Sequence, residues 1–453
     1  MSTPLLISTL GVLLLQGCSS RPLLTDGDLL TSVGGGAIDR GYDVAVDSHG
    51  NALVVGFFQG QVAIDTATVS SNGNSDVLMG KLDPDGGVLW LASAGGPGLD
   101  TGRSIAVDAE GNALVTGSFD GQVVFGDTVL SCNGDDDVFV AKLSPTGQVL
   151  WAISFGGPGH DEGHGIAVDA GGAVYVTGLF NEQASLGGAV LTSGGSHDIF
   201  VAKLSPAGHP LWATSAGGPG RDIGDAIALD ADGNIYLTGR VDPRAAIGST
   251  ALASRGHWDL FVAKLSPTGQ ALWAASAGGR SDNDGGNDVT VDADGNPIVI
   301  GSFEGQAVID GATLASAGKE DTLVAKLSSD GTRLWSTSIG GSGRQLGHAL
   351  APTPDGTVVV AGFFEGDAAL GASALTAGGG GDLFVATLSS DGQLLEATTA
   401  GGTGGRCTAN GITMSADGRL LVVGAFNGTA TFGATQRVAV GGDDLFLWRL
   451  DPP

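Results

Sequence analysis

The sequence is poor in basic residues. Its 453 positions hold 20 Lys and Arg against 48 Asp and Glu, which gives a formal net charge of −28. A surface of this sign repels phosphate backbones and anionic lipid headgroups. We therefore expect no nucleic-acid partner, and solubility explains most of the excess charge.

Cysteines and the common catalytic motifs are also scarce. The three cysteines, Cys18, Cys132 and Cys407, form no CxxC pair and indicate no disulfide framework, although Cys132 and Cys407 are left as a possible pair across the fold. No P-loop, nucleophile elbow, HExxH or dinucleotide-binding fingerprint occurs. The sequence thus predicts no cofactor and singles out no catalytic residue.

Glycine and apolar residues are abundant instead. Glycine accounts for 80 residues, and 42 % of the chain is hydrophobic. This is too apolar for a disordered glycine-rich chain. Many short strands joined by tight turns fit the composition better.

The N-terminus has the pattern of a targeting signal. The apolar run from Leu5 to Leu15 is too short to span a bilayer but suits the hydrophobic region of a signal peptide. It leads into Leu15, Gly17 and Cys18, which resemble the lipobox of bacterial lipoproteins. The resemblance implies a signal peptide over 1–17, a lipid on Cys18, a tether over 18–24 and an outer-membrane lipoprotein of the cell envelope. A plain cleavable signal is the alternative.

Most of the chain after residue 25 is an internal repeat. The aspartate that opens each "DxFVAKL" segment recurs at intervals of 61 or 62 residues, at Asp76, Asp137, Asp198, Asp259, Asp321, Asp382 and Asp444. A second marker, the aspartate of "IAVD", recurs with the same period at Asp47, Asp108, Asp169, Asp230 and Asp292. Two independent markers with one period indicate seven copies of one structural unit.

Each unit is predicted to form four main strands. "SIAVDA" and "ALVTGSF" are joined by a hairpin turn, a small hairpin follows, and "DVFVAKLS" then turns into "QVLWAIS". Four antiparallel strands per unit, repeated radially, describe an all-β, seven-bladed β-propeller over 25–453. A β-solenoid is the alternative, but its strands are parallel.

The last unit ends after "DLFLWRL" and lacks its fourth strand. A spare segment, "DGDLLTSVGGG", stands before the first unit. We expect Leu29 and Leu30 to complete the seventh blade beside "DLFLWRL", because closure removes the exposed edges of the ring. The units as a whole resemble the bacterial seven-bladed (SBBP-type) propeller repeat of secreted and surface proteins. That resemblance implies the fold and an extracytoplasmic location, and no catalytic residues.

Two residue patterns have competing interpretations. The last strands carry a tryptophan in five units, at Trp90, Trp151, Trp212, Trp273 and Trp335, which we assign to packing between blades rather than to a ligand site. "GHDEGHG" places His160 and His164 four residues apart, a spacing that can bind zinc on a helix. Because the segment lies in a glycine-rich loop, we predict no metal site there.

The long blade-to-blade loops are the predicted binding region. They carry an aspartate at one aligned position, Asp39, Asp100, Asp161 and Asp222, followed in later units by Asn283, Gln345 and Arg406, with Arg280 and Arg344 nearby. The aspartates are either ligand-binding groups or acceptors for the amides of their own loops. The first interpretation makes Asp39, Asp100, Asp161, Asp222, Arg280, Arg344 and Arg406 the candidate binding residues.

The sequence favours a lipid-anchored binding scaffold for a protein or a polysaccharide. The alternative is an extracytoplasmic hydrolase or lyase with its site in the mouth of the channel. An enzyme should show a non-repeating pair of carboxylates, or a cluster of histidines, converging on that mouth.

Overall fold

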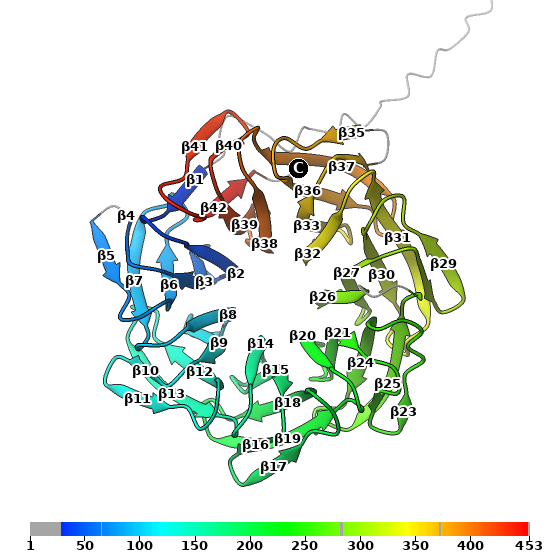
Figure 1. Ribbon diagram of the computed structural model, residues 1–453, viewed down its shortest axis with the longest axis horizontal. Helices are drawn as coiled ribbons and strands as arrows, with labels where there is room; N and C mark the ends of the chain where they lie inside the picture. Colours follow the sequence, from blue (N-terminus) through cyan, green and yellow to red (C-terminus); the bar gives the residue numbers. More distant parts are fainter. Residues whose placement is uncertain (1–28, 65, 281–283, 371–372, 452–453) are drawn as a thin grey trace, which may run out of the picture.

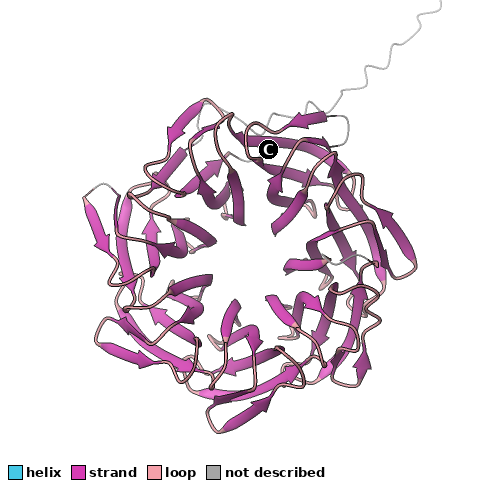
Figure 2. Cartoon of the chain, in the orientation of Figure 1, coloured by secondary structure: helices cyan, strands magenta, loops and turns pink. Residues whose placement is uncertain are grey.

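The computed structural model describes residues 29–64, 66–280, 284–370 and 373–451. Over these residues the chain forms strands, turns and loops without a helix (Figure 2). Seven blades, each with four main antiparallel strands, surround a central channel (Figure 1). Two of the seven sheets gain a further pair of strands from the small hairpin of the next blade. The predicted seven-bladed β-propeller is confirmed. No helix of the described part is long and apolar enough to cross a membrane.

The strands fall into four concentric sets. The innermost strands are β2 (Arg40–Val46), β8 (Asp100–Val107), β14 (Glu162–Val168), β20 (Ile223–Leu229), β26 (Gly285–Val291), β32 (Gln345–Pro352) and β38 (Cys407–Met414). The second strands are β3 (Ala52–Phe58), β9 (Ala113–Phe119), β15 (Val174–Phe180), β21 (Ile235–Val241), β27 (Pro297–Phe303), β33 (Val358–Phe364) and β39 (Leu420–Phe426). The third strands are β6 (Asp76–Leu82), β12 (Asp137–Leu143), β18 (Asp198–Leu204), β24 (Asp259–Leu265), β30 (Asp321–Leu327), β36 (Asp382–Leu388) and β42 (Asp444–Leu450).

The outermost strands are β7 (Val88–Ala94), β13 (Val149–Phe155), β19 (Pro210–Ala216), β25 (Ala271–Ala277), β31 (Arg333–Gly341), β37 (Leu394–Gly401) and β1 (Leu29–Val33). A small hairpin separates the second and third strands of every blade, as expected. The hairpins are β4–β5 (Gln61–Ile64, Ala67–Ser70), β10–β11 (Gln122–Phe125, Thr128–Ser131), β16–β17 (Gln183–Leu186, Ala189–Thr192), β22–β23 (Ala246–Ile247, Thr250–Ala251), β28–β29 (Gln306–Ile309, Ala312–Ala315), β34–β35 (Asp367–Leu370, Ser373–Thr376) and β40–β41 (Thr429–Phe432, Thr435–Val438).

Each hairpin docks on the outer strand of the preceding blade. The backbone N–H of Val124 donates to the carbonyl of Gly95, and that of Ser185 donates to Gly156. In the sixth and seventh blades this contact becomes regular strand pairing, since β34 pairs with β31 and β40 pairs with β37. The hairpins therefore cover part of the outer edge of each sheet, which would otherwise expose unpaired backbone groups.

The two aspartate markers of the repeat have different structural roles. The aspartate of "IAVD" lies at the first turn of the blade, where Asp108 accepts the backbone N–H groups of Glu110 and Asn112. The same carboxylate forms an ion pair of 2.7 Å with Lys142 of "FVAKL". This pair occurs in blades one to five, and blades six and seven replace the aspartate by Thr353 and Ser415. The turn and the third strand are thus fixed to each other by one charge pair.

The tryptophans pack between blades, as predicted. The indole N–H of Trp90 donates to the carbonyl of Pro145 in the turn of the next blade, at 3.1 Å. Gly147 of that turn has φ +82°, and a Cβ placed on it would lie 2.9 Å from the Trp90 ring. Only glycine therefore fits beneath the ring.

The apolar core lies between the sheets rather than in one centre. Leu53 and Val77 of the first blade, for example, pack in one cluster with Phe119 and Phe139 of the second. Full burial of such a side chain contributes about 1.5–3 kcal/mol. Because each cluster needs two blades, no blade buries its own apolar surface alone.

Ring closure follows the predicted pairing. Strand β1 lies antiparallel to β42, with Leu30 opposite Trp448 and Val33 opposite Leu445. Leu30 and Val33 are buried. The pairing of the N-terminal segment with "DLFLWRL" is confirmed over residues 29–33, whereas residues 26–28, the proposed tether, Cys18 and the signal peptide lie outside the described residues.

Cys132 and Cys407 are both free thiols, so they do not pair.

We predict that deleting residues 25–33 destabilises the whole ring. The deletion removes the pairing of β1 with β42, which comprises five residue pairs, and two buried apolar side chains. Thermal unfolding should show a fall in Tm of more than about 5 °C, or loss of soluble protein. Deleting residues 19–23 is the control and should leave Tm within about 2 °C. Equal Tm values for the two deletions would contradict the closure.

Candidate functional site

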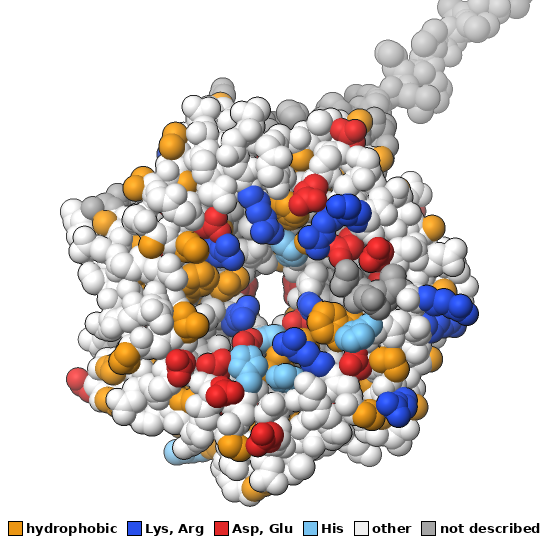
Figure 3. Space-filling view, viewed as in Figure 1, with side chains coloured by type: hydrophobic (Ala, Val, Ile, Leu, Met, Phe, Trp, Pro, Cys, Tyr) orange, Lys and Arg blue, Asp and Glu red, His pale blue; other side chains and the backbone are white. Residues whose placement is uncertain are grey.

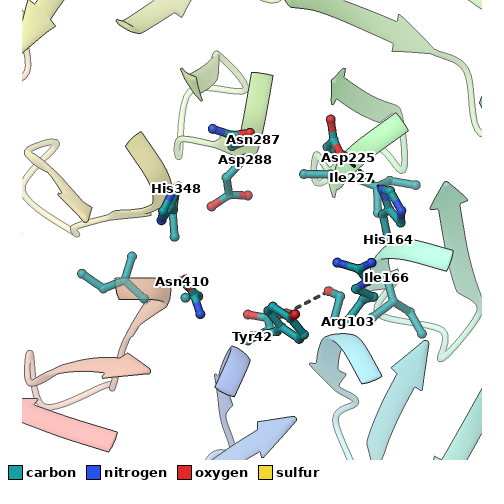
Figure 4. A pocket seen from close by; sticks show the side chains of 17 residues that line it. Tyr42, Arg103, His164, Ile166, Asp225, Ile227, Asn287, Asp288, His348 and Asn410 are labelled. Atoms are coloured by element: carbon teal, nitrogen blue, oxygen red, sulfur yellow. Dashed lines mark hydrogen bonds and ion pairs between the residues drawn. The ribbon is translucent and has the colours of Figure 1, made fainter. Parts of the chain in front are cut away.

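A cavity of about 480 Å³ lies in the central channel, and the innermost strands line it. Each of these strands has a β-bulge, so one extra residue per blade leaves the regular register. A bulge re-aims a side chain locally. The seven bulge residues all line the cavity (Figure 4): Tyr42, Arg103, His164, Asp225, Asn287, His348 and Asn410.

Glycine before the bulge allows the strand to pass close to the preceding blade. A Cβ on Gly163 would lie 2.3 Å from Oγ1 of Thr116, and one on Gly224 would lie 2.4 Å from Oγ1 of Thr177. Six of the seven innermost strands have glycine at this position, and the seventh has Ala409. The backbone at the bulge is therefore repeated while the bulge residue is free to vary.

The bulge residues are all polar, yet their chemistry differs around the ring. The sequence holds five residue types at this position, whereas the tryptophan and aspartate positions of the repeat keep one type in most blades. Positions that serve the fold repeat because every blade has the same task. A ring of unlike polar groups around one cavity has the features of a ligand site.

These side chains also connect neighbouring blades. The amide of Asn287 donates to the carbonyl of Gly347 at 2.7 Å, and that of Asn410 donates to Gly41 at 2.8 Å. Arg103 reaches Glu162 at 3.1 Å and lies over the Tyr42 ring. The bulge residues are therefore held in place by contacts with neighbouring blades. Their remaining polar atoms face the cavity.

Two non-repeating carboxylates, Asp43 and Asp288, line the same cavity. Each accepts a backbone N–H of the following blade, from Ile105 for Asp43 and from Leu350 for Asp288. Burial raises the pKa of Asp288 to about 7, and the charge of Asp43 acts in the same direction. Burial also raises the pKa of Asp43. A carboxyl group in this range can hold a proton near neutral pH.

His348 offers a hydrogen-bond acceptor to the cavity. Its Nδ1 lies 2.7 Å from the carbonyl oxygen of Ala409, which requires Nδ1 to carry the proton. Burial lowers the pKa of His348, so the ring is neutral at pH 7 and Nε2 has a free lone pair. Such a nitrogen can accept a hydrogen bond or a proton from a bound molecule.

The aspartates predicted from the blade-to-blade loops occupy a different position. Asp39, Asp100, Asp161 and Asp222 are fully buried. Asp100 accepts the backbone N–H of Gly96 at 2.7 Å, and Asp39, Asp161 and Asp222 accept the equivalent amides. Each of these carboxylates thus accepts an amide of its own loop, which was the second interpretation of the pattern. Their role in binding stays a prediction.

In two blades, the residue predicted for the aligned loop position is off by one residue. In the fifth blade Asp284 accepts the N–H groups of Gly279 and Glu304, and the predicted Asn283 lies outside the described residues. In the seventh blade buried Cys407, and not Arg406, pairs with Phe426 as Asp100 pairs with Phe119. The loops of these two blades differ in length, which shifted the alignment of the repeat.

The buried aspartates lie close to the aspartates that open the third strands. Burial raises the pKa of Asp100, Asp161, Asp222 and Asp284 to about 7, and the neighbouring carboxylate adds to the shift in each case, as Asp76 does for Asp100. Oδ1 of Asp76 and Oδ1 of Asp100 are both buried without a hydrogen-bond partner. The loops are therefore sensitive to protonation.

The three predicted arginines are not brought together as one group. Arg344 forms a 2.7 Å ion pair with Glu320, Arg406 lies 4.5 Å from the ring centre of Phe363, and Arg280 is exposed. Arg344 and Trp258 line a second cavity of about 270 Å³, which shares Asn287 and His348 with the central cavity. Figure 3 shows basic, histidine and acidic side chains around the mouth of the channel.

The cavity-lining residues were missed by the sequence analysis. Their signal was present in the aligned repeats, as a position that is polar in every unit and differs between most units. It directly follows "DxG" in the first five units. Tyr42, Arg103 and His348 lie in segments that look like the rest of the strand. Only the bulge, which is a property of the backbone, turns them into the channel.

One group of titratable residues meets the chemical requirements of a metal ligand set. Asp136, His160 and Glu162 each place a ligand atom within 4.8 Å of the others. Hydrogen bonds to Asp136 and Glu162 raise the pKa of His160 to about 10, which shows that this position favours positive charge. The histidines of "GHDEGHG" therefore lie in a charged cluster rather than in an isolated loop.

The sheet topology defines the class of the protein as a seven-bladed β-propeller. No family model matches the chain. The chain is similar to an uncharacterized WD repeat-containing protein of Acanthamoeba polyphaga mimivirus, at 22 % identity over 76 % of this chain and 32 % of the relative. It is also similar to the regulatory protein FlaEY of Caulobacter vibrioides, at 28 % identity over 39 % of this chain and 19 % of the relative. The chain thus spans about a third or less of these relatives.

Two solved structures align with most of the chain. The WD40 repeats of RRP9 align over 93 % of this chain and 97 % of theirs, with 9 % identity and a TM-score of 0.46. A polysaccharide lyase of family PL25, an ulvan lyase, aligns over 91 % of this chain and 97 % of its own, with 13 % identity and a TM-score of 0.43. Identities this low concern the fold alone.

We predict that Asp100→Asn reduces the dependence of stability on pH. The Asp100 carboxyl has a pKa of about 7 when folded against an ordinary value of 3.8, so the unfolded state binds fewer protons between about pH 4 and pH 7. The wild-type contribution is present below pH 4 and is lost as the pH rises through 7. The free energy of unfolding of the wild type should decrease from pH 5 to pH 8. In Asp100→Asn this decrease should be smaller by on the order of 2 kcal/mol, because the contribution of the Asp100 carboxyl is removed.

Denaturant unfolding at the two pH values measures this difference. Asp85→Asn, in an exposed turn, is the matched control and should keep the wild-type dependence. If Asp100→Asn showed the same change between pH 5 and pH 8 as the wild type, the shifted pKa would be wrong.

Proposed function

We propose that the chain is a cell-envelope propeller, anchored by a lipid on Cys18, that binds a carbohydrate chain in its central channel. The observation that supports it is the ring of seven unlike polar side chains at the bulges, inside a scaffold whose other positions repeat. The polysaccharide is therefore preferred over the protein partner that the sequence left as an equal alternative.

The chemistry of the cavity favours a ligand rich in hydroxyl groups. Amides, imidazoles, carboxylates and a tyrosine hydroxyl supply donors and acceptors within one small volume. The arginines at the mouth do not demand an anion, because Arg40, Arg103, Arg240 and Arg344 are already paired with carboxylates. Tyr42 and Trp258 add aromatic rings to the lining of the two neighbouring cavities. Arg103 lies over the Tyr42 ring, and Arg221 and Arg240 lie over the Trp258 ring. A cavity of this size admits a few sugar units and excludes a folded domain.

We predict that a glycan which binds the protein loses affinity at least about tenfold in Tyr42→Ser and in Arg103→Gln, or about 1.4 kcal/mol. A glycan array identifies the ligand, and isothermal titration calorimetry measures the affinity. Arg419→Gln is the matched control, since Arg419 lies at a turn between β38 and β39 on the opposite face. Glycan binding that is equal in all three variants, or no glycan binding at all, would contradict the proposal.

We predict a diacylglyceryl group on Cys18. The support is the lipobox-like segment that ends at this cysteine. Mass spectrometry of protein extracted from membranes should find the lipid on an N-terminal Cys18 peptide. A mature N-terminus at another residue, with an unmodified Cys18, would rule out the anchor.

A hydrolase or lyase in the same cavity is the second candidate. Asp43 and Asp288 are the non-repeating carboxylate pair that an enzyme should show, and a carboxyl with a pKa of about 7 suits a general acid. Release of new chain ends from the bound glycan, lost in Asp288→Asn while binding persists, would establish the enzyme. Binding without turnover supports the scaffold.

A further inference from the structure

We propose that Asp136, His160 and Glu162 form a binding site for a divalent transition-metal ion, with Zn²⁺ as the best-suited ion. The site lies at the mouth of the channel, where the loop that enters the third blade meets the second blade. It adjoins the central cavity, because Arg103 and His164 line that cavity and also contact Glu162.

The three side chains converge closely. One ligand atom from each residue lies within 4.8 Å of the other two. Nδ1 of His160 lies 2.6 Å from Oδ2 of Asp136, and Nε2 of the same ring lies 3.0 Å from Oε1 of Glu162, so a metal ion bound to one ring nitrogen leaves the hydrogen bond of the other in place. Imidazole nitrogen and carboxylate oxygen are standard zinc ligands, and a zinc ion with three protein ligands keeps a fourth position for water. Two carboxylates with one imidazole also supply the negative charge that a divalent cation requires.

Neighbouring side chains already hold Glu162 in place. Glu162 is held through its other oxygen by Nε2 of His164 at 2.8 Å and by Arg103 at 3.1 Å. Nδ1 of His164 in turn lies 3.2 Å from Asp225. The edge of the His197 ring adjoins His160, with the ring centres 5.9 Å apart. Metal sites depend on such outer contacts to orient their ligands.

The fold does not require these residues. The positions equivalent to His160 hold Leu99 and Arg221 in the neighbouring blades, and those equivalent to Glu162 hold Thr101 and Ile223. The loop is braced independently by Asp161, which accepts the N–H groups of Gly157 and Asn181. Three of the seven histidines of the chain therefore gather at one point without a task in the propeller itself.

The local conformation explains why this site is hard to recognise in the sequence. His160, Glu162 and His164 are alternate residues, and Glu162 and His164 belong to strand β14. Alternate residues share one side of a strand. His160 and Glu162 are therefore in contact at the start of the strand, and His164 contacts Glu162 instead of serving as a ligand.

Titration of the untagged full-length protein with ZnCl₂ tests the site. Calorimetry, with elemental analysis after dialysis, should give one Zn²⁺ per chain. His160→Gln and Asp136→Asn should each weaken binding at least about tenfold, because each removes one ligand. His257→Gln is the matched control, since His257 is exposed and pairs with Asp242 outside the cluster, and it should bind like the wild type.

Circular dichroism and Tm show whether each variant is folded, and Asp136→Asn changes the fewest contacts if His160→Gln fails. X-ray absorption of the Zn²⁺-loaded wild type should show imidazole scattering with ligands at about 2.0 Å. Absence of stoichiometric Zn²⁺, or unchanged affinity in both ligand variants, would overturn the site. Either result leaves the glycan proposal standing, because glycan binding is measured separately.

Discussion

The pairing of β1 with β42 is the contact on which the whole ring depends. Every apolar cluster of the protein lies between two blades, so each blade is stable only with both neighbours present. An open ring would leave the seventh blade with an exposed strand and one face of its core without cover. Closure by the N-terminal segment joins residues 29–33 to residues near the end of the chain, and so makes the stability of the ring a cooperative property.

The closed ring separates positions that serve the fold from positions that serve a site. The Asp108–Lys142 pair and the Trp90 contact with Gly147 have equivalents in most blades. The bulge residues differ between most blades, and the Asp136–His160–Glu162 cluster has no equivalent among the described residues. Both non-repeating groups lie around the same channel, whose backbone is held by the repeating ones. A rigid, repeated frame can vary these side chains at little cost to the fold.

The architecture was predictable because its signals are local and repeated seven times. The period, the turn residues and the missing last strand led to the propeller and its closure. The site was not predictable in the same way. The aspartates of the loops are the most regular polar residues of the repeat, and that regularity reflects their bracing of backbone amides, as for Asp100 and Gly96. The cavity residues depend on a bulge and on the meeting of seven strands, neither of which is visible in one unit.

The central claim is that the bulge residues form the ligand site, and a crystal structure with a bound oligosaccharide tests it most directly. The account predicts sugar density in the central cavity, within hydrogen-bond distance of Arg103, Asn410 or Nε2 of His348. Density at the outer hairpins or on the opposite face, with the central cavity empty, would contradict it.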